Sequence, residues 1–156
     1  MKSDQKLKLI FTVICTLLSL VIILDFSIAS APITEEVVAV SATRESHNNA
    51  GGNSHFSFKA RTENHHFSVS EGFAGSLAKA DEVKLSYTPI FNEVNTVRIT
   101  ETGESEIFSL RLLSGLILPL LILIVLAIGY KFGSKWSNVV FVFEVLAFAD
   151  FVYLLN

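Results

Sequence analysis

The sequence predicts a membrane α-helical protein that also carries a small all-β domain. Three observations support this fold class: hydrophobic residues make up 51% of the 156-residue chain, its mean hydropathy is +0.52, and its apolar residues gather in the long runs Leu9–Leu24, Phe108–Tyr130 and Val139–Leu155. A helix needs ~20 mostly apolar residues to cross a bilayer. We therefore expect three transmembrane helices, an N-terminal anchor and a C-terminal hairpin, flanking a five-stranded barrel-like or curled sheet.

The expected boundaries follow composition, and the expected orientation follows charge. The predicted segments are a cytoplasmic N-terminus at 1–8, a helix at 9–31, a β-domain at 32–106, a helix at 107–130, a cytoplasmic loop at 131–136 and a helix at 137–156. Short loops rich in lysine stay on the cytoplasmic side, and lysines precede the first run and separate the last two: Lys2, Lys6, Lys8, Lys131 and Lys135. This charge pattern predicts a multi-pass protein of the cytoplasmic (inner) membrane. The single cysteine, Cys15, lies in the first apolar run, and an exported domain without disulfides fits a bacterial envelope. The N-terminus is expected inside, with the β-domain and the C-terminus outside.

The first apolar run has an alternative interpretation. A lysine-rich start, an apolar run and the small residues of Ser27–Ala29 or Ala29–Ala31 also match a secretory signal peptide with its cleavage site. The length of the run, Asp25 before the site and Pro32 directly after it favour a retained anchor.

Apolar and polar residues alternate in the middle of the chain, as they do in half-buried strands. The clearest case is Ser54–Arg61, where Phe56, Phe58 and Ala60 share one face. A turn follows, and Phe67 then begins an inward face. The predicted strands are Ile33–Thr43, Ser54–Arg61, His65–Ser70, Glu82–Tyr87 and Val94–Thr100, with one short helix possible at Phe73–Ala80.

One segment resembles a known pattern. Leu77–Pro89 reads Leu-Ala-Lys-Ala-Asp-Glu-Val-Lys-Leu-Ser-Tyr-Thr-Pro. It resembles the Leu-x-x-Gly-Asp-x-Val-x-Val-x-Tyr-x-Pro strand of uncharacterised bacterial membrane proteins that carry a small β-domain beside transmembrane helices. Ala80 stands where that family has glycine. The resemblance covers about a dozen residues and implies architecture only, because the family has no assigned chemistry.

Charge and motifs exclude several classes of function. Residues 31–107 contain eleven acidic and six basic residues, which argues against binding nucleic acid or anionic lipid headgroups. The sequence contains no nucleophile motif, phosphate loop, dinucleotide fingerprint or zinc-protease helix. We therefore expect no enzymatic activity and no cofactor.

The histidines are candidates for a metal site. His47, His55, His65 and His66 lie close together in the sequence, and histidine is the commonest metal ligand. Across the predicted hairpin, His55 could face either His65 or His66, but adjacent residues of a strand point to opposite sides. A polar strand face whose imidazoles meet water is the favoured explanation of these residues.

Acidic residues in apolar helices are costly and are usually paired or functional. Asp25, Arg111 and Asp150 are expected at similar depth near the outer face, so we predict that Arg111 pairs with Asp150, Asp25 or both. Such a cluster would clip the helices together or relay a cation or proton. Glu144 lies deeper, in the inner half of the third run, where no basic residue shares its depth.

Three kinds of group are candidates to satisfy Glu144. Hydroxyl or thiol groups on the first run could bond it, namely Thr12, Cys15 and Thr16. It could carry a proton, because burial favours the neutral carboxyl. A basic or polar residue of another subunit is the third candidate.

Pro119 is expected to interrupt the second run, because it has no N–H to donate to the carbonyl of Gly115.

Taken together, these patterns predict an accessory or interaction protein of a larger membrane or envelope assembly. It is expected to contact membrane lipid, and to contact protein partners through its hairpin or its β-domain. The first alternative is a subunit of an ion- or proton-handling complex that uses Glu144 and Asp150. The second is a metal-binding envelope protein.

Overall fold

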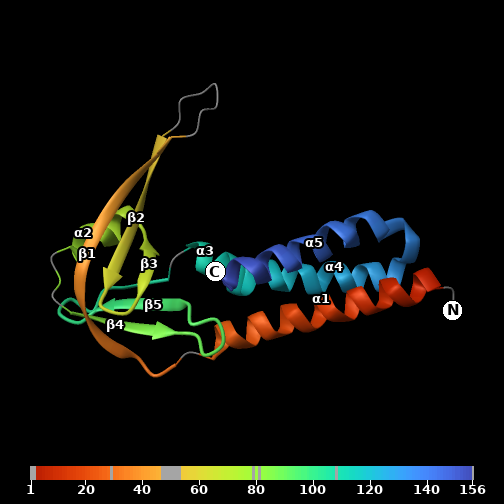
Figure 1. The fold of residues 1–156 in the computed structure, drawn as a ribbon, viewed down its shortest axis with the longest axis horizontal. Coiled ribbons are helices and arrows are strands. Elements are labelled where there is room, and N and C mark those ends of the chain that lie inside the picture. Colours follow the sequence, from red (N-terminus) through yellow and green to blue (C-terminus); the bar gives the residue numbers. More distant parts are fainter. Residues whose placement is uncertain are drawn as a thin grey trace. The chain divides into compact units, whose positions relative to one another are not determined.

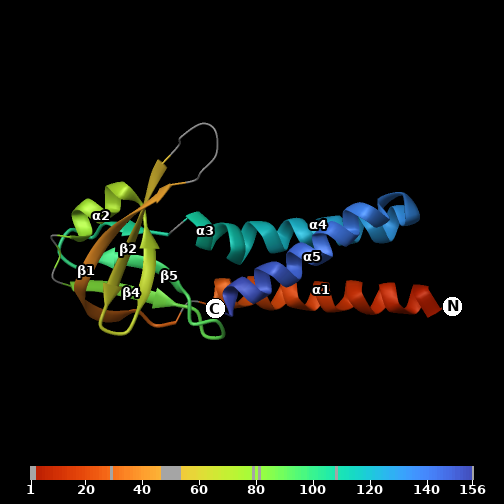
Figure 2. The ribbon, with the colours of Figure 1, turned by 45° about the horizontal axis from the view of Figure 1, so that its top comes forward.

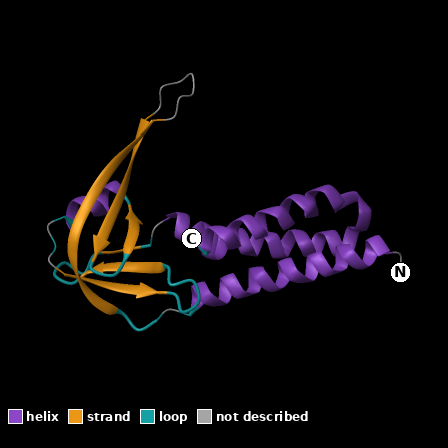
Figure 3. Ribbon diagram, in the orientation of Figure 1, coloured by secondary structure: helices purple, strands orange, loops and turns teal. Residues whose placement is uncertain are grey.

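The computed structural model describes residues 3–28, 30–46, 54–78, 80, 82–107 and 109–155. The chain divides into two compact units. The helical unit contains residues 1–28, 89–91 and 110–156, and the β-unit contains residues 29–88 and 92–109. Figure 3 distinguishes the helices of the first unit from the strands of the second.

Long apolar helices build the helical unit, as the sequence predicts. The first is α1 (Ser3–Ser27). The second apolar run forms the continuous series α3 (Ser109–Leu112), a π-helical segment (Leu113–Ile117) and α4 (Leu118–Phe132). A 3₁₀ turn (Gly133–Trp136) then leads to α5 (Ser137–Leu154). Within the described part of the chain, three helices are long and apolar enough to cross a membrane: Gln5–Ser27, Ser109–Phe132 and Ser137–Leu154.

The helices α1, α4 and α5 run side by side and pack pairwise (Figures 1 and 2). Their shared core contains Cys15, Ile122, Leu126 and Ala147. Gly129 allows the close approach of α4 and α5, because a Cβ at this position would collide with Val140. Many large apolar side chains point away from this core, including Leu17, Ile124 and Phe141, which are 57%, 54% and 64% exposed.

The predicted interruption at Pro119 takes the form of the π-helical segment Leu113–Ile117. In this segment the N–H of Leu118 donates to the carbonyl of Leu113, five residues earlier. Pro119 has no N–H, so the Gly115 carbonyl one turn before it lacks its α-helical partner. Widening the backbone turn is one way in which helices accommodate such a mismatch.

The β-unit is a curled, antiparallel half-barrel sheet with strand order β3-β2-β1-β4-β5-β6. Its strands are β1 (Ile33–Ser46), β2 (Ser54–Thr62), β3 (His66–Val69), β4 (Glu82–Tyr87), β5 (Val94–Ile99) and β6 (Ser105–Glu106). All five predicted strands are confirmed, but the predicted number is wrong because the sheet has a sixth strand. Ser105 and Glu106 form a strand too short to show alternation, so the sequence pattern did not reveal β6.

The core of the β-unit lies on the concave side that the alternation predicts. Phe67, Val69, Val83, Leu85, Val97 and Ile99 are buried in one cluster. The short helix α2 (Glu71–Leu77) packs against β2 and contributes Phe73 and Leu77 to this cluster. The Ser70 hydroxyl caps α2 by accepting the Phe73 N–H at 3.3 Å. The Glu106 carboxylate accepts the Ser70 N–H at 2.9 Å, which ties β6 to the start of α2.

One part of the sheet is a two-stranded ribbon. The pairing of β1 with β4 covers only Ile33–Glu36, and the pairing of β2 with β3 begins only at Phe58. Beyond these points the described residues of β1 and β2 pair with each other alone, through registers such as Thr43 opposite Ser57. On the face that this ribbon shares with the core, Phe56 is 56% exposed and its ring lies 6.4 Å from that of Phe58.

Candidate functional site

Glu144 on α5 meets only part of its hydrogen-bonding capacity inside the helical unit. The Thr12 hydroxyl on α1 donates to Glu144 Oε1 at 2.9 Å. The other two predicted partners do not reach the carboxylate. The Cys15 thiol contacts the backbone carbonyl of Glu144 at 3.8 Å, and the Thr16 hydroxyl donates to the Thr12 carbonyl at 2.8 Å. Within the described part of the chain, Glu144 forms no ion pair.

The Glu144 side chain lines a cavity of about 700 Å³ in the helical unit. Its apolar walls come from α1, α4 and α5 and include Leu9, Leu126, Val140, Phe141 and Val142. Its polar lining includes Lys8, Thr12, Ser137, Asn138 and Glu144. The Lys8 ammonium is held by the Ser137 hydroxyl at 3.5 Å. The cavity is thus mostly apolar, with one acidic group, Glu144, and one basic group, Lys8, in its lining.

Asp25 and Arg111 form a buried ion pair in the helical unit. Arg111 Nη2 lies 3.8 Å from Asp25 Oδ2, and the two side chains are 5% and 0% exposed. The other oxygen of Asp25 accepts the backbone N–H of Ile90 at 2.7 Å. The Arg111 guanidinium also lies 5.2 Å from the centre of the Phe26 ring. Asp25, one of the two predicted partners of Arg111, thus lies within ion-pair distance of it.

Asp150 on α5 is buried, and Arg111 attracts its carboxylate electrostatically. Ser19 and Ser114 are buried in the same unit. Among the described residues, Asp150 Oδ2 and the hydroxyls of Ser19 and Ser114 have no hydrogen-bond partner. The structure therefore places Asp25, Arg111 and Asp150 in one electrostatic group, and it leaves polar capacity in the helix core unused.

The backbone that follows Arg111 allows its helix to approach α1 closely. Arg111 lies on the last turn before the π-helical segment, and Gly115 lies within that segment. A Cβ at Gly115 would collide with the Phe26 ring, whose face the Arg111 guanidinium covers. Glycine is therefore required for the close approach of this segment to α1, a role that the sequence pattern did not indicate.

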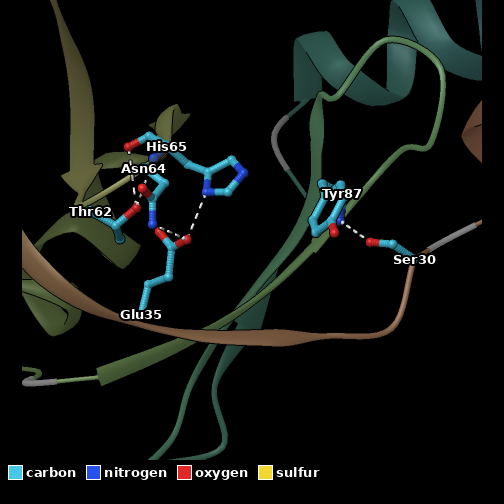
Figure 4. Close-up of polar contacts among 6 residues, drawn as sticks. All are labelled: Ser30, Glu35, Thr62, Asn64, His65 and Tyr87. Carbon is cyan, nitrogen blue, oxygen red and sulfur yellow. Dashed lines mark hydrogen bonds and ion pairs between the residues drawn. The ribbon is translucent and has the colours of Figure 1, made fainter.

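A second polar cluster lies in the β-unit and contains a residue that the sequence analysis missed. Glu35 on β1 is buried, and its Oε1 contacts His65 Nδ1 at 3.0 Å and accepts the Asn64 amide at 3.2 Å (Figure 4). Thr62 shapes the turn that presents both residues, because its hydroxyl bonds the His65 backbone. The period of two through Ile33, Glu35 and Val37 was the available signal, since it places Glu35 on the core side of β1.

These neighbours control the ionisation of Glu35. Burial by itself would raise the pKa of this carboxyl. The polar groups of Thr62, His65 and Asn64 outweigh burial and hold the pKa of Glu35 below its usual range. The Glu35 carboxylate is therefore a stable, charged partner for the His65 ring.

The His65 ring also packs against an aromatic side chain. Its ring stacks on Tyr87, with centroids 5.7 Å apart and planes at 28°. Tyr87 is fixed at the end of β4 by its backbone N–H, which donates to the Ser30 hydroxyl at 3.1 Å (Figure 4). The adjacent His66 is exposed on β3.

The predicted metal site has no counterpart in the described residues. Over the described ranges, no three or more histidine, cysteine or acidic side chains come together as a metal site. His47 and the side chain of His55 lie outside the description. Of the predicted metal ligands, His65 is instead paired with Glu35.

Comparisons with known proteins identify no family for this chain. Neither the protein-family models, nor the curated proteins, nor the solved structures give a match to this chain. The resemblance of Leu77–Pro89 to uncharacterised membrane proteins therefore remains an expectation from the sequence.

Proposed function

We propose that this chain is an integral protein of the cytoplasmic membrane that presents its β-unit on the outer side as an interaction module of a larger envelope assembly. The observation that carries the proposal is the apolar surface that the long helices leave exposed. Apolar side chains such as Leu17, Ile124 and Phe141 stay exposed along helices of membrane-spanning length. A lipid environment covers such surfaces, whereas water would not.

Helix direction supports the proposed orientation. The Lys8 ammonium on α1 contacts Ser137 at the start of α5, so these two segments meet at one end of the helical unit. The basic residues at the start of α1 and around the turn from α4 to α5 therefore belong to the same side, which the positive-inside rule makes cytoplasmic. Tyr130 and Trp136 are exposed near this end, as interfacial aromatic residues are.

The orientation is tested by labelling single cysteines in a Cys15→Ala background. Glu104 and Lys135 are both exposed and lie in different units. We expect a membrane-impermeant maleimide to label Glu104→Cys in intact spheroplasts, and to label Lys135→Cys only after permeabilisation. The reverse pattern would overturn the proposed orientation.

The β1–β2 ribbon supports an interaction role. An isolated two-stranded hairpin is marginally stable in water, and Phe56 exposes an aromatic ring at 56% on the apolar face of this ribbon. Lys59 is exposed on the opposite face of the same strand. We propose that a protein partner covers the Phe56 face with an apolar surface of its own.

Purification of the full chain in a mild detergent tests this interface. A partner should be recovered in a fixed ratio with the wild type and with Lys59→Ser, and should be lost with Phe56→Ser. A wild-type protein that purifies as a clean monomer, or a partner that Phe56→Ser retains, would argue against the interface.

A second candidate function is ion or proton handling within a complex. The observation that favours it is the buried carboxylate of Asp150, whose Oδ2 lacks a hydrogen-bond partner among the described residues and which Arg111 attracts. Buried acids of this kind mark proton and cation paths in membrane proteins. Proteoliposomes of the full assembly should then lose their flux with Asp150→Asn or Glu144→Gln, and an unchanged flux would end this candidate.

A further inference from the structure

The cavity beside Glu144 has the dimensions and the lining of a ligand site. Its volume is about 700 Å³, and small-molecule sites in proteins span roughly 300–1,000 Å³ with mostly apolar walls and a few polar groups. Side chains such as Leu126 and Val140 form its apolar walls, and Glu144 supplies its acidic group. Residues of the helical unit alone line this cavity.

The groups around Glu144 position its side chain. The Thr12 hydroxyl lies 2.9 Å from Glu144 Oε1 and 3.0 Å from the Lys8 carbonyl, so it holds the Glu144 side chain against α1. The Lys8 ammonium lines the same cavity but donates to Ser137. Across the described residues Glu144 has no ion pair. A negative group in an apolar wall strongly favours a positive partner, because water screens it poorly there.

We propose that this cavity binds a small lipophilic cation, an organic ammonium or phosphonium, whose charge pairs with Glu144 and whose apolar groups contact the walls. Phe141 and Tyr130 also line the cavity, and aromatic faces attract organic cations. A neutral acyl chain would fill the apolar space but could form no ion pair with the Glu144 carboxylate. An anionic ligand would be repelled by Glu144.

The proposal is tested with tetraphenylphosphonium as the probe. The full-length protein in nanodiscs of zwitterionic lipid is titrated by calorimetry, and tetraphenylborate serves as the matched probe with the same shape and the opposite charge. We expect saturable binding of the cation at one site per chain and no saturable binding of the anion.

Variants of the cavity locate the site. Glu144→Gln should weaken tetraphenylphosphonium binding by about tenfold or more, because a desolvated charge pair is lost. Val142→Trp should also weaken binding by filling the space, since Val142 lines the cavity. Glu101→Gln, which removes an exposed acid of the β-unit, is the matched control and should bind as the wild type does. The unfolding temperature of each variant separates loss of the site from loss of the fold.

Several results would overturn the proposal. One is equal binding of the cation to the wild type and to a folded Glu144→Gln. Another is equal binding of tetraphenylborate and tetraphenylphosphonium. A third is a wild type that binds no cation while Glu144 crosslinks to a basic residue of a partner helix, which would assign the cavity to protein docking. None of these results bears on the Phe56 interface, which is tested separately.

Discussion

Asp25 and Glu144 are both acidic side chains on helices of the same unit, yet the chain treats them differently. Asp25 is fully buried, has Arg111 as its ion-pair partner and accepts a backbone hydrogen bond from Ile90. Glu144 receives one hydroxyl hydrogen bond from Thr12 and otherwise faces a cavity. The comparison teaches that an acid with its own internal counter-charge acts as a structural link. An acid that lacks one and borders open space is available to a ligand or a partner.

The largest expected effect on stability comes from removing Arg111, the ion-pair partner of Asp25. Arg111→Ala leaves a buried carboxylate without its counter-charge, and breaking such a pair costs about 3–5 kcal/mol. We expect this loss in the free energy of unfolding of the purified protein, measured by denaturant titration in detergent. Arg98→Ala, which removes an exposed arginine of β5, is the control and should change little. An Arg111→Ala protein as stable as the wild type would show that the pair is not a structural link.

The packing that supports Arg111 gives the next effect. Gly115→Ala would force a Cβ against the Phe26 ring, and overpacking of this kind costs about 1–3 kcal/mol. Gly72→Ala is the matched control, because a Cβ at Gly72 of α2 meets nothing within 4 Å. Thermal unfolding should show a loss for the first variant and no loss for the second. Equal unfolding temperatures would mean that Phe26 moves aside at little cost.

Glu35, a buried acid of the β-unit, allows a test through the pH dependence of stability. Its folded-state pKa lies below the ordinary value of 4.5, so its carboxylate contributes stability that is present above pH 4.5 and is lost as the pH falls through the lower folded-state pKa. We expect the stability advantage of the wild type over Glu35→Gln to shrink progressively below pH 4.5. Denaturant unfolding followed by circular dichroism at several pH values measures this advantage. An advantage that stays constant down to acidic pH would contradict the role given to the polar groups around Glu35.

The smallest expected effect on stability comes from changing Glu144. Glu144→Gln keeps an oxygen that can accept the Thr12 hydrogen bond, and the exchange of one such hydrogen bond changes stability by only about 1 kcal/mol. The free energy of unfolding should therefore stay close to that of the wild type. A loss as large as that of Arg111→Ala would mean that Glu144, like Asp25, is a structural link.

Much of the fold could be predicted because the deciding patterns are local. Apolar runs predicted the long helices, and the alternation in Ser54–Arg61 and Glu82–Tyr87 predicted β2 and β4. The two-residue strand β6 could not be predicted, since Ser105 and Glu106 pair with β5 through backbone groups that any sequence offers.

The candidate sites were only partly predictable for the same reason. The approach of Thr12 to Glu144 follows from matching depth on two helices, which the sequence supplies. The Glu35–His65 contact joins residues thirty positions apart, across strands whose register only the folded sheet defines. The cavity beside Glu144 depends on how three helices fit together, and residue spacing carries no information about that fit.

The π-helical segment Leu113–Ile117 has a consequence for how this helix tolerates changes in its length. A π-bulge holds one residue more than the α-helical turn that it replaces, and each residue of an α-helix advances the side chains by about 100°. Deleting one residue from this segment could therefore restore regular α-helix. The wider turn takes up the rotation of the extra residue, so after such a deletion Arg111 would keep nearly the same angular position relative to Ile122 and could still face Asp25. The bulge thus holds one extra residue without changing the angular phase between the charged end and the apolar body of this helix.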